Sequence, residues 1–480
     1  MAEEESRLEE RLIVNEEEGD EDLKKRVWEE TKKIWRVAFP GILARATNFG
    51  NIIITQAVIG HVSALDLAAF ALVQSLTVRF VNGIVLGMSS ATETLCGQAF
   101  GAGQHHMMGI YLQRSWIVNL ITVTILLPIF IFAGPIFVAL GQEKEIANVS
   151  EIISLWLIPL SYCFVFSLTI QMYLQAQLKN MIVAWLSVIS FLVQIFLSWL
   201  LVIKLELGIP GAIGSLILSN FFIVLGEFVY LLFGGCPLSW KGFTWDAFSQ
   251  LWPVIKLSVS SGVMLCLELW YNSVLVLIAG YMENATVAIS AFSICLNASA
   301  WELMICIGFL GAACVRIANE LGRGNAKAIR FSIKVNLATS IVFGLVFFTI
   351  CLIFGDEIGY LFTSDQDVVN MVSELSILLA LTMLLNSIQP VLTGIAIGAG
   401  LQSTVAIINL VCYYVIGIPV GLLLGYFTNL QVKGVWIGMV CGVAMQIICL
   451  SILIWRTNWD DQVVKASQRL NRWLKPIDLS

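Results

Sequence analysis

Charged side chains are scarce in this chain. Asp, Glu, Lys and Arg make up 12% of the 480 residues, whereas about 25% is usual in a soluble domain. Apolar residues make up 58%, and a soluble core of this length cannot use so much apolar surface. The composition therefore excludes an ordinary soluble protein and indicates a chain embedded in a membrane.

Motifs for catalysis and metal binding are also missing. The chain has three histidines, His61, His105 and His106, and two adjacent imidazoles alone are a weak metal signal. Its eleven cysteines form no C-x-x-C pair and are interpreted as apolar packing residues. No P-loop, Rossmann glycine pattern, H-E-x-x-H or G-x-S-x-G appears. We therefore expect no enzyme, no metal, no cofactor and no site that uses ATP.

Apolar runs of about 20 residues, the length a helix needs to cross a bilayer, recur along the whole chain. They predict an all-α membrane protein with about twelve transmembrane helices. The expected spans are 35–61, 67–97, 112–139, 151–174, 182–203, 209–234, 254–281, 287–316, 332–354, 368–397, 403–426 and 433–455. Both tails are expected to be solvated. The Glu-rich residues 1–22, which carry much of the net charge of −6, are expected to be disordered and give no reason for a nucleic-acid partner.

Two segments of the chain are similar and lie 221 residues apart (308 − 87). Residues 87–103 align without gaps on 308–324, so that Gly101 falls on Gly322. In a membrane protein, two similar halves suggest a transporter with its site between or inside the halves. The repeat predicts two pseudo-symmetric six-helix lobes. The expected order is an acidic tail (1–33), an N-lobe (34–235), an inter-lobe loop (236–253), a C-lobe (254–455) and a second tail (456–480).

Lys and Arg are divided unequally between the two sides of the membrane. If the N-terminus is cytosolic, most of them lie on that side, including Lys24, Arg114 and Arg323. The opposite loops hold only Lys144, Lys204 and Lys433. The positive-inside rule therefore predicts that both tails and the inter-lobe loop are cytosolic.

Four separated blocks resemble the signature blocks of plant multidrug and toxic compound extrusion (MATE) transporters, also called detoxification-type proteins. They are TETLCGQAFGAGQHHMMGIYLQRSW (92–116), CLELWYNSVLVLIAG (266–280), VRIANELGRGN (315–325) and LLNSIQPVLTGIAIGAGLQ (384–402). The resemblance runs from about residue 30 to 460 and includes both halves. It implies the MATE fold, whose central cavity opens alternately to each side. It also implies export of organic compounds, usually against a proton gradient, and a vacuolar membrane rather than the plasma membrane.

Glu268 is the most informative charged residue, because it lies at the midpoint of span 254–281 among apolar neighbours. A charge inside a bilayer is costly unless it is paired or faces water. Desolvation favours the protonated carboxyl group, so Glu268 can take up a proton from one side and release it to the other. The resemblance agrees, since plant MATE proteins carry an acid in this motif. The alternative is a protonated or paired carboxyl group that only holds helices together.

Glu302, near mid-depth in the eighth span, is the second proton-coupling candidate. If its role is structural, an arginine on a neighbouring helix would be its partner. Asn386 stands where the family pattern often has an aspartate, which casts doubt on a two-carboxylate relay, and it can hydrogen-bond Glu268. The candidates for a substrate cavity are Asn386, Asn272, Tyr271, Asn297, Trp270 and Gln389.

The N-lobe carries charge of the opposite sign. Arg45 and Arg79 lie in the first two spans, and Glu93 is expected to neutralise one of them in a structural ion pair. Thr55 stands roughly at the position where prokaryotic MATE proteins resemble one another in having an aspartate in the first span. The alternatives are an N-lobe that tolerates anions and a protein that carries cations only through the C-lobe.

These features together predict a secondary active exporter that works by proton antiport. Its substrates would be organic compounds, either xenobiotics or plant secondary metabolites such as alkaloids or flavonoids. The partners expected are the small organic substrate, protons and the lipid bilayer, and we expect a monomer. Two other functions stay open: an anion channel or transporter of the same fold, and a lipid-linked saccharide flippase, which would favour a strongly cationic cavity.

Overall fold

The computed structural model describes residues 23–471, except 280–284, 356, 362–364 and 429. Every regular element in this part of the chain is a helix. Eleven helices are long and apolar enough to cross a membrane, and the pair α7 and α8, bent by 44° at its break, makes up to twelve among the described residues. The predicted all-α membrane fold is therefore confirmed.

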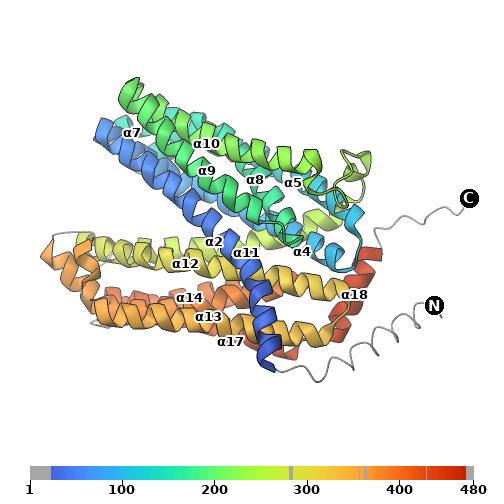
Figure 1. The fold of residues 1–480 in the computed structure, drawn as a ribbon. Helices are drawn as coiled ribbons and strands as arrows, with labels where there is room; N and C mark the ends of the chain where they lie inside the picture. Colours follow the sequence, from blue (N-terminus) through green and yellow to red (C-terminus); the bar gives the residue numbers. More distant parts are fainter. Residues whose placement is uncertain (1–22, 280–284, 356, 362–364, 429, 472–480) are drawn as a thin grey trace, which may run out of the picture.

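The first six spans form one bundle, the first bundle (Figure 1). In chain order its elements are α2 (Leu23–Val62), α3 (Ala64–Leu72), η2 (Val73–Val78), α4 (Arg79–Gly101), α5 (His105–Ile131), α6 (Ala133–Ala139), α7 (Lys144–Trp156), α8 (Ile158–Ala176), α9 (Met181–Ser198), η3 (Trp199–Lys204), α10 (Gly208–Tyr230) and η4 (Leu231–Gly235). A loop that contains the 3₁₀ turn η5 (Trp245–Phe248) leads to the second bundle.

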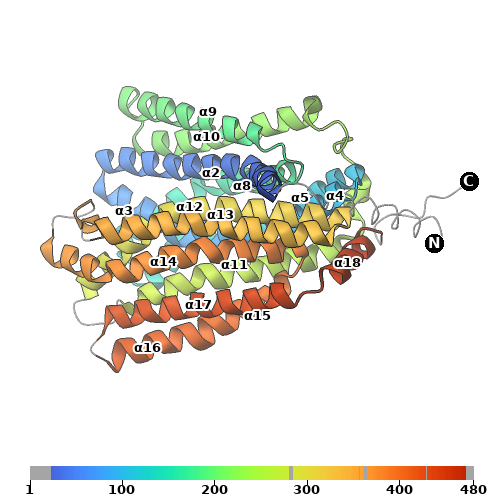
Figure 2. The same ribbon diagram turned by 60° about the horizontal axis from the view of Figure 1, so that its bottom comes forward.

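The remaining six spans form the second bundle, which lies beside the first (Figure 2). Its elements are α11 (Leu251–Ala279), α12 (Ala285–Arg323), α13 (Ala326–Phe354), η6 (Ile358–Leu361), α14 (Gln366–Ala399), α15 (Gln402–Asn409), η7 (Leu410–Gly417), α16 (Ile418–Tyr426) and α17 (Val432–Arg456). One further helix, α18 (Trp459–Asn471), follows α17.

Local chemistry sets several helix ends. α3 begins after Ser63, whose hydroxyl accepts a hydrogen bond from the Asp66 amide, and Asp365 caps α14 in the same way. α14 ends at Gly400, whose φ of 77° is left-handed and therefore favours glycine. The polar cap and the glycine explain why the apolar run of α14 starts and stops where it does.

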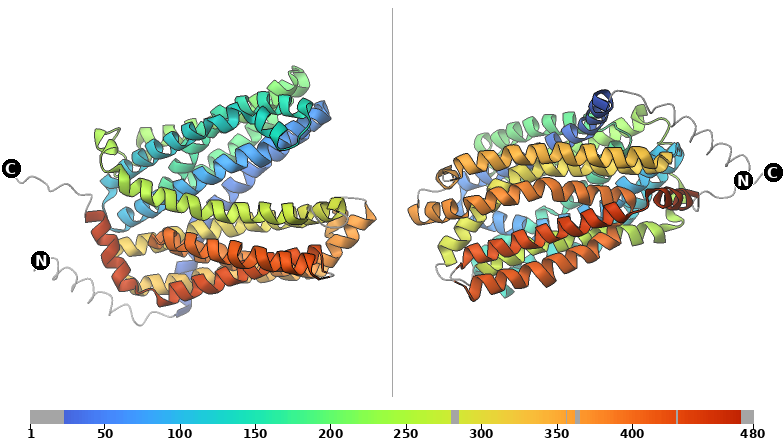
Figure 3. Two further views of the ribbon diagram at one scale, coloured as in Figure 1. Left: turned by 180° about the vertical axis from the view of Figure 1, so that it is seen from behind. Right: turned by 90° about the horizontal axis from the view of Figure 1, so that it is seen from below.

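The two bundles lie close together at the end that carries α18 and apart at the opposite end (Figures 1 and 3). We call these the α18 end and the far end. At the α18 end, a Cβ atom on Gly101 of α4 would overlap the backbone oxygen of Asn319, and one on Gly322 of α12 would overlap that of Gln98. The glycine pair of the internal repeat therefore lets α4 and α12 touch backbone to backbone.

Hydrogen bonds join the bundles at the same place. Thr94 Oγ1 donates to Ile397 O at 2.8 Å, and Gln98 Nε2 donates to Gly398 O at 3.0 Å. Both donors lie on α4 of the first bundle, and both acceptors lie near the end of α14 in the second. We call this contact region the seam.

The described parts of the two tails differ from the prediction, whereas residues 1–22, expected to be disordered, lie outside the described residues. α2 begins at Leu23, so residues 23–33 are helical, and Glu30 is buried in an ion pair with Arg316. The segment expected to be a solvated C-terminal tail contains α18, in which Trp459, Ala466 and Leu470 are buried. A short amphipathic helix of this kind has a buried stripe but no long apolar run, so a search for membrane spans passes over it.

Candidate functional site

Glu268 lies on α11 and is half-buried. Its Oε1 atom accepts a hydrogen bond from Gln389 Nε2 of α14 at 3.1 Å. Its Oε2 atom is buried and has no hydrogen-bond partner among the described residues. A carboxylate in this position leaves one charged oxygen without a hydrogen bond. A protonated carboxyl group is neutral, so its burial costs less free energy.

Glu302 lies on α12 and is 1% exposed. Cys306, one turn further along the helix, donates from Sγ to Oε1 at 2.7 Å, and the Asn386 side chain approaches the same carboxyl group. No arginine forms an ion pair with Glu302 among the described residues, so the expected structural partner is replaced by a thiol and an amide.

α14 therefore presents one amide to each acid. Asn386 and Gln389 are three residues apart and lie on neighbouring positions of one helix surface. Gln389 Nε2 also lies 3.2 Å from Thr393 Oγ1, one turn further on. The sequence suggested that Asn386 could hydrogen-bond Glu268, but Gln389 makes that bond and Asn386 faces Glu302.

Tyr271 lies inside the second bundle. Its ring stacks on Tyr413 of the π-helical segment η7 at 4.5 Å, and its hydroxyl donates to Gly438 O at 3.2 Å. Tyr413 in turn donates to Gln446 Oε1, and its hydroxyl is close enough to Glu268 to interact with it electrostatically. Tyr413 and Gln446 thus belong to the surroundings of Glu268, and nothing in the sequence alone singled them out.

The other cavity candidates are scattered. Trp270 is 42% exposed and stacks on Phe80 of α4 at 5.4 Å, which places it between the bundles. Asn297 is exposed on α12. Asn272 belongs to α11, but its side chain lies outside the described part of the structure.

Arg45 of α2 and Glu93 of α4 interact electrostatically, although no ion pair within 4.0 Å joins them. Glu93 Oε1 accepts a hydrogen bond from Gln175 Nε2 at 2.8 Å, and the Cys314 thiol of α12 also contacts this carboxyl group. Arg79 is exposed at the start of α4. The Arg45–Glu93 pair therefore lies against the second bundle, while Arg79 lies apart from it.

Two polar features of the first bundle were not predicted from the sequence. Glu227 of α10 is fully buried, accepts a bond from Ser167 Oγ at 3.2 Å, and has a buried Oε2 without a partner. The rule that pointed to Glu268, a charge inside an apolar span, also applies to Glu227. Gln194 of α9 donates to Thr55 Oγ1 at 2.9 Å, and as a neutral residue it gave no comparable signal.

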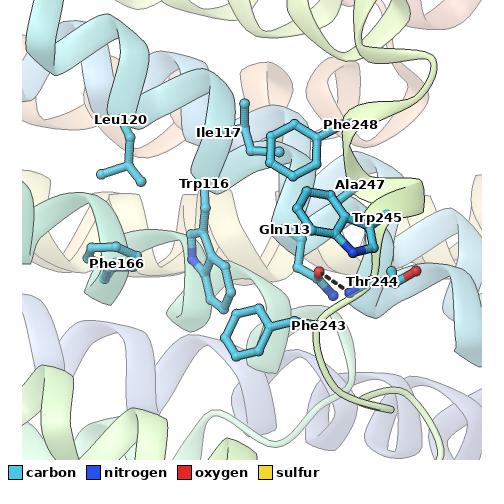
Figure 4. Close-up of a pocket in the computed structure, with 10 residues that line it drawn as sticks. All are labelled: Gln113, Trp116, Ile117, Leu120, Phe166, Phe243, Thr244, Trp245, Ala247 and Phe248. Atoms are coloured by element: carbon cyan, nitrogen blue, oxygen red, sulfur yellow. Dashed lines mark hydrogen bonds between the residues drawn. The ribbon is translucent and has the colours of Figure 1, made fainter.

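A pocket of about 450 Å³ lies between α5, α8 and the loop around η5 (Figure 4). Aromatic rings line most of it, and Gln113 Oε1 accepts a hydrogen bond from the Thr244 amide at its edge. The full lining is Gln113, Trp116, Ile117, Leu120, Phe166, Phe243, Thr244, Trp245, Ala247 and Phe248. None of the helices that carry Glu268, Glu302 or Glu93 contributes to it, so this pocket is separate from the acids.

The described residues contain no group of three or more His, Cys, Asp or Glu side chains able to hold a metal ion. Two bundles of membrane-spanning helices, joined at one end and holding carboxyl groups inside their spans, define a membrane transporter. The chain belongs to the MATE family, whose sequence model, MatE, matches residues 40–200 and 261–423. MATE proteins are transporters and not enzymes, so the predicted family and class are confirmed.

Relatives in Arabidopsis thaliana are similar over nearly their whole length. Protein DETOXIFICATION 24 is 53% identical over 455 residues, which are 95% of this chain and 91% of the relative. Protein DETOXIFICATION 21 is 50% identical over 461 residues, or 96% and 93% of the two chains. The crystal structure of the eukaryotic MATE transporter AtDTX14 matches with a TM-score of 0.86 and 30% identity, covering 92% of this chain and 99% of that one.

Proposed function

We propose that this MATE transporter exports organic compounds from the cytosol in exchange for protons. The observation that carries the proposal is Glu268, whose Oε1 accepts a hydrogen bond from Gln389 while its buried Oε2 has no partner among the residues that the structure describes. A carboxyl group in this setting can exist in a charged and a neutral form with different surroundings. Such a group is suited to bind a proton in one state of the transporter and to release it in another.

The proposed cycle has four steps. An organic solute, either a xenobiotic or a plant secondary metabolite, enters from the cytosol while Glu268 is ionised. The bundles then rock so that the site faces the opposite side, as in alternating access. Protonation of Glu268 from the acidic side weakens the hold on a cation and favours release. Return to the cytosolic side releases the proton.

The energetics of this exchange are sufficient. One pH unit corresponds to about 1.4 kcal/mol per proton. A gradient of about two units, as across the membrane of an acidic compartment, would concentrate a neutral substrate roughly a hundredfold per exchanged proton. The resemblance to plant MATE proteins implies the vacuolar membrane, which bounds such a compartment, and we propose that the protein works there as a monomer.

The distribution of basic residues supports a cytosolic α18 end. Lys144, Lys204 and Lys433 lie at the far-end termini of α7, η3 and α17. The α18 end carries many more basic residues, among them Arg323, Lys327, Arg330, Arg456, Lys465 and Arg469. Protease protection of tags fused at residues 1 and 480 tests this orientation, and a tag protected inside sealed cytosol-side-out vesicles contradicts it.

The two rival functions have less support. An anion pathway would need unneutralised basic groups between the bundles, but Arg45 lies near Glu93, and Glu268 and Glu302 add two further acids. The same balance argues against a flippase for lipid-linked saccharides, which would favour a cationic cavity.

Uptake into proteoliposomes with an imposed pH gradient tests the proposal. A panel of labelled organic cations, neutral compounds and anions is offered with the gradient in either direction or absent. Proton antiport predicts accumulation that depends on the gradient and collapses with a protonophore. Accumulation that ignores the gradient, or currents far larger than transporter turnover, would instead favour passive transport or a channel.

A further inference from the structure

The C-terminal helix α18 lies across the α18 end of both bundles. Its apolar positions recur at Trp459, Val463, Ala466 and Leu470, which form a single stripe along one helix face. Trp459, Val463 and Ala466 pack into the core that α12, α13 and α14 form in the second bundle. Leu470, only one turn further on, belongs to the core of α4, α5 and α8 in the first bundle. The helix α18 therefore packs against both the first and the second bundle.

Arg469 makes the corresponding polar contact. Its Nη1 atom donates to Oε1 of Gln98 on α4 at 3.2 Å, and the other end of the Gln98 amide donates to Gly398 O of α14. Gly400, which ends α14, makes room for this side chain, because a Cβ atom there would lie 2.5 Å from Nη1 of Arg469. Arg469 therefore touches both sides of the seam and holds the amide that bridges it.

The guanidinium group is largely removed from water in this position. Burial lowers the pKa of Arg469, and the nearby Tyr111 side chain opposes this effect. A buried guanidinium group needs its hydrogen-bond acceptor, since an unsatisfied buried charge is costly. At its other end, beside the buried Trp459, α18 forms an exposed ion pair between Asp460 and Arg330, at 3.3 Å. The contact with the first bundle is therefore concentrated in Arg469 and Leu470.

We propose that α18 is a clasp that stabilises the state closed at the α18 end, with Arg469 as the positioning residue that acts through Gln98. This inference rests on the proposed alternating access, because the bundles must separate at the seam when that end opens. α18 is fixed to the second bundle by the buried side chains of Trp459 and Ala466 and the partly buried Val463, so it moves with that bundle and its contacts with Gln98 and the first core break. The clasp thus biases the equilibrium between the two states.

The reactivity of the native Cys314 can be used to measure opening of the seam, so no cysteine needs to be engineered. It is fully buried on α12, and its thiol contacts Glu93 of the first bundle, so it becomes reachable when the seam opens. Cys351 is equally buried but lies within the second bundle, where its thiol donates to Ser376 O. Peptide mass spectrometry measures the rates at which N-ethylmaleimide alkylates Cys314 and Cys351. The ratio of the Cys314 rate to the Cys351 rate increases with the fraction of molecules that are open at the α18 end.

The test compares Arg469→Gln with Lys465→Gln, which removes the same charge from an exposed position of the same helix. Loss of a hydrogen bond to a charged group corresponds to about a tenfold change in an equilibrium constant. We expect the relative alkylation of Cys314 to rise about tenfold in Arg469→Gln and to stay unchanged in Lys465→Gln. Leu470→Ala, which removes the apolar contact instead, is expected to raise it as well.

Three results overturn the clasp. In the first, Cys314 reacts at the parent rate in Arg469→Gln and Leu470→Ala. In the second, Lys465→Gln has the same effect as Arg469→Gln, so that the charge of the helix matters and the contact does not. In the third, Cys314 and Cys351 become reactive together, so that α18 only stabilises the fold. The assay needs neither substrate nor a proton gradient, so its outcome is independent of the outcome for proton antiport.

Discussion

Gln389 donates a hydrogen bond to one oxygen of Glu268 at 3.1 Å, across 121 positions of sequence. The other oxygen of Glu268 is buried and has no hydrogen-bond partner in the described part of the chain. The amide holds the carboxyl group in place without neutralising its charge, so the group remains free to gain or lose a proton. This relationship between α11 and α14 is the basis of the first prediction.

Glu268→Gln is expected to fold and reach the membrane but to lose proton-driven transport, because the amide keeps size and hydrogen bonding while it removes titration. The dependence of substrate binding on pH should disappear with it. Transport into vesicles with an imposed pH gradient, at matched protein levels, measures both effects. Glu374→Gln on α14 is the matched control, since its carboxyl group is exposed and pairs with Lys433. Near-normal antiport by Glu268→Gln would move the coupling role elsewhere, with Glu302 as the next candidate.

Asn386→Asp is expected to retain transport and to shift its pH profile. The new carboxyl group would face Glu302, and two neighbouring carboxylates disfavour the doubly ionised form. The pair therefore keeps one proton up to a higher pH, and the profile moves to higher pH. Transport rates across a pH series test the direction. Asn370→Asp, at an exposed position in the first turns of α14, should leave the profile unchanged. A shift to lower pH in Asn386→Asp would contradict the geometry.

Hydropathy predicted the helices well, because a membrane span needs a long apolar run and the chain has few charges to interrupt one. The twelve expected ranges overlap the helices of the structure, and the MATE fold follows. The predicted spans were too short where a helix extends beyond its apolar run. α2 begins earlier than predicted, at Leu23, and α12 ends later, at Arg323.

The partners of the acids could not be predicted in the same way. Which amide of α14 faces which acid depends on how the three helices α11, α12 and α14 are rotated about their axes relative to one another. The sequence marked Glu268 and Glu302 as unusual, but it gave no means to assign Gln389 to one and Asn386 to the other. Tyr413 escaped for the same reason, since only the stacking of η7 on α11 brings it near Glu268.

Arg316→Met is expected to destabilise the protein by about 3 kcal/mol, because it leaves the buried carboxyl group of Glu30 without its bidentate partner. Thermal unfolding of the purified protein in detergent measures the loss. Adding Glu30→Gln to this variant should recover part of it, since one buried unpaired charge is then removed, while Glu320 loses Arg316 and keeps its ion pair with Arg323.

Arg330→Met is the matched control for the buried pair. Arg330 bonds Asp460 at 3.3 Å with both side chains largely exposed, and such pairs contribute at most about 1 kcal/mol. A loss of stability in Arg330→Met as large as that in Arg316→Met would show that burial of the Glu30–Arg316 pair is not what makes it important.

Gly322→Ala is expected to prevent full closure at the α18 end, because the new methyl group would overlap the backbone oxygen of Gln98. Backbone atoms cannot move aside as a flexible side chain can, so α4 and α12 must separate. Relative alkylation of the seam thiol Cys314 should rise and transport should fall. Gly214→Ala is the control, since a Cβ atom there meets nothing within 4 Å and alanine is favoured in a helix. Parent-like alkylation and transport in Gly322→Ala would mean that close contact of the repeated glycines is not required for the transport cycle.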